Sequence, residues 1–279
     1  MKLFSNHLYI VSTPIGNLDD ITLRAIEILK KSDIILCEDT RRSLKLLNHL
    51  SIKKKLEPYH KFNERKKLTL IIKYIKEGKI LSLISDAGTP LLSDPGRLLI
   101  NECIKEEIKV SPIPGASSIT AAMSVSGFDD KFLFYGFLPK KDRELESVLK
   151  NLSHYKFSQV FFIPALKISF YIKKIQKYFH DRKLIIAKEI TKVHENFYRG
   201  EVKNFKTAKI PKKGEITLII SEKLSMSQKF DKSVIVNKAK KYLKKYSLRD
   251  TVELIMETES VNKKEIYQLC LDIKNDENS

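Results

Sequence analysis

The residues with the clearest chemical potential lie in one loop of small, acidic and proline residues, 86–96. The loop follows residues 80–84, an apolar run typical of a buried strand in a parallel sheet. In α/β proteins, ligands bind at the carboxyl ends of such strands. Gly88 lets a ligand approach the backbone, while Pro90 and Pro95 restrict the conformation of the loop. The pattern predicts a ligand-binding loop, and a tight connection without a ligand is the alternative.

Three carboxylates that follow apolar runs are candidates for moving a proton. Glu38 and Asp39 follow residues 34–37, and Glu189 follows residues 184–187. A carboxylate that faces a ligand pocket can accept a proton from a bound hydroxyl group. Structural roles fit the same residues, because Asp39 can cap a helix and Glu189 can pair with a neighbouring lysine. We take all three as catalytic candidates and leave these structural roles open.

The sequence contains no phosphate-binding or metal-binding motif. The loop after the first predicted strand has one glycine, Gly16, and no GxGxxG pattern. The three cysteines are far apart in sequence, and the six histidines show no metal-ligand spacing. We therefore expect neither a nucleotide held by its phosphates nor a metal ion, and we expect the cysteines to be reduced.

These residues must be positioned by alternating strands and helices. Strands are predicted at residues 8–11, 34–37, 56–59, 80–84 and 108–113, with helices over 23–31, 44–50, 68–75, 98–106 and 116–125. Such alternation indicates a parallel, wound sheet. We therefore predict a first α/β domain over residues 1–126 that carries most of the ligand-loop motifs.

The character of the sequence changes after residue 126. Further strands at 132–137, 160–163, 184–187 and 215–220, with helices between them, predict a smaller mixed α/β domain over residues 127–224. Residues 225–230 are typical of a polar linker. Helical patterns follow in residues 225–279, and those at 248–258 and 263–269 suit either a helix-turn-helix pair or an ordinary helical hairpin.

Composition and charge narrow the class of protein. Of the 279 residues, 42% are hydrophobic, which is enough for folded cores. No apolar run approaches membrane-spanning length and residues 1–7 lack a signal-peptide pattern, so we expect a cytoplasmic protein. The net charge is +18, and residues 116–224 hold 21 basic against 11 acidic residues. This concentration favours a face that binds a polyanion, with a compositional bias toward lysine as the alternative.

Seven segments resemble, in order and spacing, those of the bacterial ribosomal RNA small-subunit methyltransferase I group within the tetrapyrrole (class III) methylases. They are LYIVSTPIGNLDDIT (8–22), CEDTRRS (37–43), LISDAGTPLLSDPG (83–96), PIPGASS (112–118), YGFLPK (135–140), AKEITKVHE (187–195) and KGEITLII (213–220). Each segment alone is weak evidence, but together they are spread over about 220 residues and make a specific match.

The resemblance implies a two-domain α/β fold like that of the tetrapyrrole methylases, with a short helical C-terminal tail. It also implies a homodimer that uses S-adenosyl-L-methionine to methylate the ribose 2′-oxygen of a cytidine in the decoding region of small-subunit ribosomal RNA. The cofactor-binding positions that it implies are Pro14, Asp86, Ala87, Gly88, Thr89, Pro90, Leu92, Gly115, Ala116, Ser117 and Ser118.

Basic residues near these motifs are candidates for holding RNA. Arg41 and Arg42 follow the strand-end carboxylates and can hold a neighbouring phosphate. A basic turn in the second domain adds Lys140, Lys141 and Arg143. We expect these five residues to bind RNA.

The chain departs from the family pattern at residues 161–167. Where the family usually reads FYES followed by an Arg, this chain reads FFIPALK. Ile163 and Pro164 replace the Glu–Ser pair, and Lys167 stands near the Arg position, so a carboxylate and a bidentate donor are lost. Two alternatives stay open: a small-molecule methylase of the tetrapyrrole type and, because of this departure, a catalytically silent RNA-binding relative.

Overall fold

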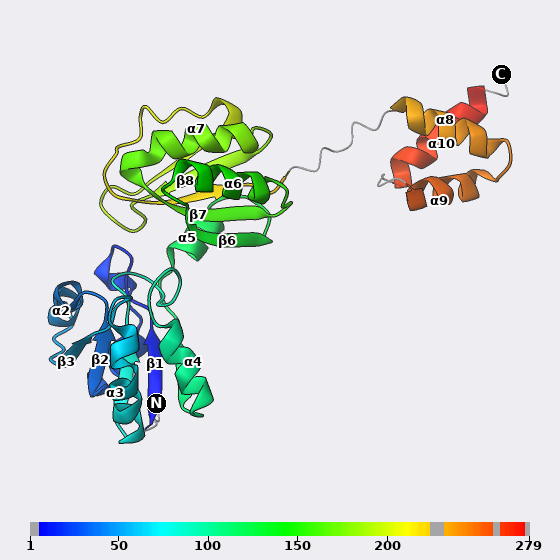
Figure 1. Cartoon of the computed structure of the whole chain (residues 1–279). Helices are drawn as coiled ribbons and strands as arrows, with labels where there is room; N and C mark the ends of the chain where they lie inside the picture. The colour runs from blue at the N-terminus through cyan, green and yellow to red at the C-terminus, as the bar shows by residue number, and fades with distance from the viewer. Residues whose placement is uncertain (1–5, 224–231, 259–262, 277–279) are drawn as a thin grey trace. The chain divides into compact units, whose positions relative to one another are not determined.

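The structure is a computed structural model that describes residues 6–223, 232–258 and 263–276. The chain divides into two compact units, Met1–Lys223 and Leu224–Ser279. Unit 1 contains two five-stranded sheets, and the described residues of unit 2 form helices (Figure 1). The linker predicted at residues 225–230 lies outside the described residues.

The first sheet is parallel throughout, as the alternation of strands and helices predicts. Its order is β3-β2-β4-β1-β5, formed by β1 (His7–Val11), β2 (Ile34–Cys37), β3 (Lys55–Pro58), β4 (Ile80–Leu83) and β5 (Lys109–Ile113). Helices α1 (Leu23–Lys31), α2 (Thr40–His49), α3 (Glu64–Lys76) and α4 (Arg97–Lys105) connect these strands. After β1 the chain continues to β2, toward one edge of the sheet, and after β4 it continues to β5, at the other edge. The strand order therefore reverses between the neighbours β1 and β4. Ligands bind at such a switch point in open α/β sheets.

Helices cover both faces of this sheet, which explains why every residue of the inner strands β1 and β2 is buried. Leu8 and Ile10 of β1 belong to a core shared with α3 and α4. The alternating residues Tyr9 and Val11 belong to a core on the other face, shared with α1 and α2. The two cores fix the strand ends, and therefore the loops that follow them.

Two of the connecting helices begin at polar caps. The Thr22 side chain accepts the Ala25 N–H at 3.1 Å, and the Asp39 side chain accepts the Arg41 N–H at 2.9 Å. The helix predicted over residues 44–50 begins earlier, at Thr40, because the Asp39 cap satisfies its first turn.

The second sheet is mixed. Its order is β6-β7-β10-β8-β9, formed by β6 (Phe132–Phe137), β7 (Ser158–Pro164), β8 (Lys183–Lys188), β9 (Asn196–Glu201) and β10 (Glu215–Ile220). Only β6 and β7 pair in parallel, and the other pairs are antiparallel. Strand β9 is absent from the sequence-based prediction, because its segment NFYRGE is short of apolar residues and lies at the sheet edge.

This sheet is also packed on both faces. Helices α6 (Asp142–Ser153) and α7 (Ile168–Tyr178) share the larger core with residues such as Phe161 and Leu218. The helix α5 (Ser118–Ser124), which follows β5, packs on the other face through Ile119 and Ala122. Since α5 follows the last strand of the first sheet, it joins the two halves of unit 1.

A buried arginine fastens one end of the second sheet. Arg182 is 2% exposed, and its guanidinium donates to the carbonyl oxygens of Ser153 at 2.9 Å, Tyr155 at 2.6 Å and Ser221 at 3.2 Å. These acceptors lie at the end of α6 and just beyond β10. One side chain therefore holds together segments that are distant in sequence.

Unit 2 has its own core. Helices α8 (Lys232–Leu243), α9 (Leu248–Thr258) and α10 (Lys263–Asp276) share buried residues that include Ile235, Ile255 and Cys270. Along the described ranges, no helix combines the length and apolar character needed to cross a bilayer.

Candidate active site

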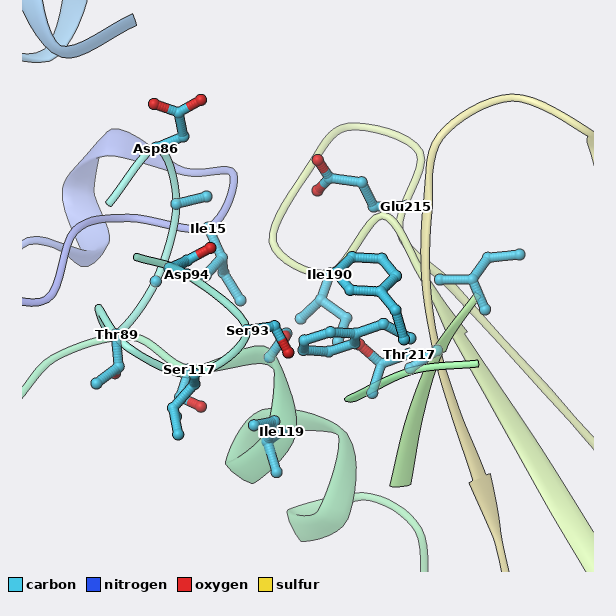
Figure 2. A pocket seen from close by; sticks show the side chains of 18 of the residues that line it. Ile15, Asp86, Thr89, Ser93, Asp94, Ser117, Ile119, Ile190, Glu215 and Thr217 are labelled. Carbon is cyan, nitrogen blue, oxygen red and sulfur yellow. The ribbon is translucent and has the colours of Figure 1, made fainter. Parts of the chain in front are cut away.

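A cavity of about 370 Å³ lies between the carboxyl ends of the first sheet and the second sheet, within the size range of small-molecule sites. The first half contributes Ile15, Glu38, Arg42, Asp86, Ala87, Gly88, Thr89, Leu92, Ser93, Asp94, Ser117, Ser118 and Ile119. The second half contributes Phe137, Phe162, Ile163, Pro164, Ala187, Ile190, Gly214, Glu215, Ile216 and Thr217. Figure 2 shows Asp86, Thr89 and Ser117 on one side and Ile190, Glu215 and Thr217 on the other.

Many of the residues singled out from the sequence come together here. Those that line the cavity are Glu38, Arg42, Asp86, Ala87, Gly88, Thr89, Leu92, Ser117 and Ser118. Pro14, Pro90, Gly115 and Ala116 are not among the lining residues. Gly115 instead lets β1 and β5 approach, since a Cβ there would lie 2.9 Å from the Ser12 Cβ. The Ala116 carbonyl accepts a hydrogen bond from the Thr89 hydroxyl at 3.3 Å and so helps to hold the loop in place.

The loop after β4 has an unusual backbone. Gly88 exchanges backbone hydrogen bonds with Thr13, at 2.9 and 3.0 Å, and has a φ of +82°. Leu91 and Ser93 also have positive φ, 73° and 76°, which side-chain-bearing residues rarely adopt. Strained backbone of this kind gathers at ligand sites. The hydrogen bonds to Thr13 and these backbone angles define the shape of the loop, and Gly88, Leu92 and Ser93 line the cavity.

Three carboxylates share the first wall of the cavity. Burial, followed by the nearby charges of Glu38 and Asp86, raises the pKa of Asp94 to about 6. Burial and the charge of Asp86 also raise the pKa of Glu38. Asp86 accepts the Asp39 N–H at 3.1 Å and lies 3.5 Å from the Arg42 guanidinium. Asp94 lies within the loop 86–96 that the sequence singles out, but it is not among the site residues predicted from the sequence.

The second wall is largely apolar. Phe162, Ile163 and Ile190 line it, and the Phe162 ring packs against Phe137 with centroids 5.2 Å apart. No sequence signal marks these residues as a ligand wall, because apolar residues in strands are normally core residues. The departure at Ile163 and Pro164 therefore lies on the cavity itself.

Glu189 takes a structural role in this wall. Its carboxylate accepts the Glu215 N–H at 2.8 Å and pairs with Lys192 at 3.1 Å. Glu189 and Thr191 have positive φ, 52° and 64°, and hold Ile190 between them. Of the three catalytic candidates, Asp39 and Glu189 have these other contacts and do not line the cavity, whereas Glu38 does.

The two walls touch at one corner. The Asn17 N–H donates to the Thr191 Oγ1 at 3.0 Å. A Cβ at Gly16 would lie 2.5 Å from the Lys192 Cγ, so only glycine fits there without movement. The single glycine of the first loop thus serves close packing between the halves of unit 1.

The basic residues predicted to bind RNA are dispersed. Arg41 pairs with Asp39 at 2.7 Å, and Arg42 lines the cavity. Lys140, Lys141 and Arg143 are exposed around the start of α6, outside the cavity.

Comparison with known proteins places the chain in a family. The profile described as Tetrapyrrole (Corrin/Porphyrin) Methylases matches residues 7–206. "Ribosomal RNA small subunit methyltransferase I" of Mesomycoplasma conjunctivae is 43% identical over 83% of this chain and 98% of its own length. The protein of the same name from Thermotoga maritima is 43% identical over 77% of this chain and 98% of its own length.

Solved structures agree on the fold. The crystal structure of the methyltransferase CobJ has a TM-score of 0.59 and 14% sequence identity, and the match covers 77% of this chain and 93% of that one. At this identity the likeness supports the architecture of unit 1 alone.

Proposed function

The chain belongs to the ribosomal RNA small subunit methyltransferase I family of the tetrapyrrole methylases, and we propose that it methylates the ribose 2′-oxygen of a cytidine in the decoding region of small-subunit ribosomal RNA. Its cofactor is S-adenosyl-L-methionine, in keeping with this methyltransferase family. The observation that carries the proposal is the cavity between the two sheets, where a wall with three carboxylates faces a largely apolar wall.

The cavity suits this cofactor. Gly88 has no side chain to fill the space beside Ile15, where a Cβ would lie 3.2 Å from the Ile15 Cγ2. Carboxylates of Glu38, Asp86 and Asp94 favour a cation over a phosphate, and the apolar second wall suits a purine ring. We assign cofactor holding to Ala87, Gly88, Thr89, Leu92, Ser117 and Ser118, with Asp86 near the positive charge. When bound, S-adenosyl-L-methionine supplies a methyl group on a positively charged sulfur.

The contribution of the chain is alignment and proton acceptance. A ribose hydroxyl is a poor nucleophile until a base takes its proton, and a base with a pKa near the working pH is most effective. Asp94 meets this requirement, with a pKa of about 6 and a place on the cavity wall. We therefore assign Asp94 as the general base and Glu38 as a second carboxylate that, after burial, helps to keep the pKa of Asp94 high. Most of the remaining rate enhancement comes from holding the hydroxyl in line with the methyl group.

Several further properties belong to the same proposal. We propose that the protein is a cytoplasmic homodimer, and that its two α/β domains, 1–126 and 127–224, close around the cofactor while 225–279 forms a helical appendage. Arg42, together with Arg41, would hold a phosphate beside the target ribose. Lys140, Lys141 and Arg143 would supply an electrostatic contact farther along the RNA.

One experiment tests the proposal directly. Small ribosomal subunits that lack the modification are incubated with the protein and S-adenosyl-L-methionine, and 2′-O-methyl positions are mapped along the RNA. We expect one new methyl group, on a cytidine ribose of the decoding region. A methyl group on a base, or methylation only of a small-molecule acceptor, would contradict the proposal. RNA binding without cofactor binding or methyl transfer would support the silent RNA-binding alternative.

A further inference from the structure

An aromatic side chain is exposed to solvent near the carboxyl ends of the strands of the first sheet. Phe62 is 89% exposed and lies in the turn between β3 and α3. Single exposed apolar residues are common on protein surfaces, so exposure alone carries no function. Three further observations distinguish this residue: the hydrogen bonds that hold the turn, its place beside the cavity wall, and its charge.

The turn that carries Phe62 is braced. The Asn63 Oδ1 accepts the His60 N–H at 2.8 Å, and the Asn63 Nδ2 donates to the Pro58 carbonyl at 3.0 Å. The backbone N–H groups of Asn63 and Glu64 both donate to the His60 carbonyl, at 2.9 and 3.0 Å. A flexible loop would let Phe62 fold onto the surface, whereas this turn fixes the backbone that presents the ring.

The turn lies at the carboxyl ends of the strands of the first sheet, where the first wall of the cavity also lies. It follows the carboxyl end of β3, and β3 pairs in parallel with β2. The Tyr59 N–H donates to the Cys37 carbonyl at 2.8 Å, directly before Glu38, which lines the cavity. A substrate chain that enters the cavity over β2 therefore passes close to this turn.

Three basic residues lie close to Phe62 in the sequence. Lys61, Arg65 and Lys66 are exposed, and none forms an ion pair with another residue that the structure describes. The carboxylates nearby are otherwise engaged: Glu57 pairs with Lys67, and the Gly96 N–H donates to Glu64 at 3.4 Å. An exposed ring flanked by free cations is the combination that single-stranded nucleic acids recognise, because bases stack on the ring and phosphates contact the cations.

We propose that Phe62 is a stacking platform for an unpaired base of the substrate RNA next to the methylated nucleotide, with Lys61 and Arg65 on the adjacent phosphates. This inference rests on the proposed RNA substrate and adds a specific contact to it. The ring and the cations have separable effects, because stacking is insensitive to salt while phosphate contacts are not.

The test compares Phe62→Ala, Phe62→Trp and Phe62→Leu in the full chain, using unmethylated small subunits as the RNA probe. We expect Phe62→Ala to weaken RNA binding about tenfold without changing the slope of affinity against salt. Phe62→Trp should restore affinity, whereas Phe62→Leu should not, because leucine keeps apolar area but has no aromatic face. The double variant Lys61→Gln, Arg65→Gln should reduce the salt slope by about one to two units.

The controls separate this inference from the proposed function. Cofactor affinity should be equal in all variants, since Phe62 does not line the cavity. If the wild type methylates the subunit and Phe62→Ala binds RNA with wild-type affinity, the stacking role is wrong while the proposed function stands. If Phe62→Ala changes the molar mass of the free protein in solution, the ring covers a second copy of this chain, and the inference is overturned. If the wild type binds no RNA, the proposed function itself fails first.

Discussion

Asp94 is the residue on which the proposed chemistry depends most. A general base accepts a proton only when it is ionised, so the transfer rate should rise with pH as Asp94 loses its proton, through a pH of about 6, and level off above it. Asp94→Asn should lower the single-turnover rate by about 10²–10⁴ and remove this rise. Glu77→Gln, at the far end of the sheet, is the matched control. An unchanged pH profile in Asp94→Asn would show that another group is the general base, and Glu38 would be the next candidate.

At Ile163, the departure from the family pattern replaces a polar residue with one that packs in a core. It is 2% exposed, pairs with Ile216 across β7 and β10, and belongs to the larger core of the second sheet. Restoring the glutamate of the family at this position should lower the free energy of unfolding by about 3–5 kcal/mol, because the carboxylate would be buried without a partner. Ile163→Val, the size control, should cost only about 0.5–1.5 kcal/mol.

Urea unfolding of both variants checks this expectation. A glutamate variant as stable as the wild type would show that the carboxylate reaches a partner across the cavity. The core would then not need an apolar side chain at position 163 for its stability.

At the scale of elements, Arg182 is the clearest long-range fastening. Arg182→Met should destabilise unit 1 by about 3 kcal/mol or more, because several carbonyl groups in the interior lose their donor. The exposed Arg199 also donates to a carbonyl, that of Val125 at 2.8 Å, so Arg199→Met is a suitable control with an expected effect within about 1 kcal/mol. Thermal and urea unfolding measure both. Equal losses in the two variants would show that burial adds nothing to the role of Arg182.

Local patterns predict many of the elements but not their pairing. The bounds of α1, β2, β10 and α9 agree with the predicted ranges, since their apolar spacing and caps lie within the segment itself. The prediction misses β9 because an edge strand of polar residues depends on its neighbour β8 for its conformation. The mixed order of the second sheet depends on contacts between distant segments, which local periodicity does not contain.

One wall of the candidate site could also be predicted from local sequence, and the other could not. The wall built by the loop after β4 was predictable, because Gly88 and Asp86 stand in a glycine- and proline-rich loop after an apolar strand. The opposite wall was not, because Phe162 and Ile190 have the sequence character of core residues. Their role follows only from how unit 1 folds.

For the whole molecule, all lining residues of the cavity lie in unit 1. The Thermotoga maritima relative is matched along 98% of its own length by 77% of this chain, so part of this chain has no counterpart in that protein. A chain shortened to end at Lys223 should therefore fold and bind S-adenosyl-L-methionine with the affinity of the full chain. Calorimetry on both chains checks this, with circular dichroism to verify folding. Loss of cofactor binding in a folded shortened chain would contradict it.

The contact between Asn17 and Thr191 joins two walls that line one cavity, and a ligand that filled this cavity would touch both. Such a ligand stabilises only the form in which both sheets are in place. By mass action, a ligand at 1,000 times its Kd adds about 4 kcal/mol to that form and nothing to one in which a sheet has detached. We therefore expect bound cofactor to reduce how often the chain opens and to slow its digestion by proteases.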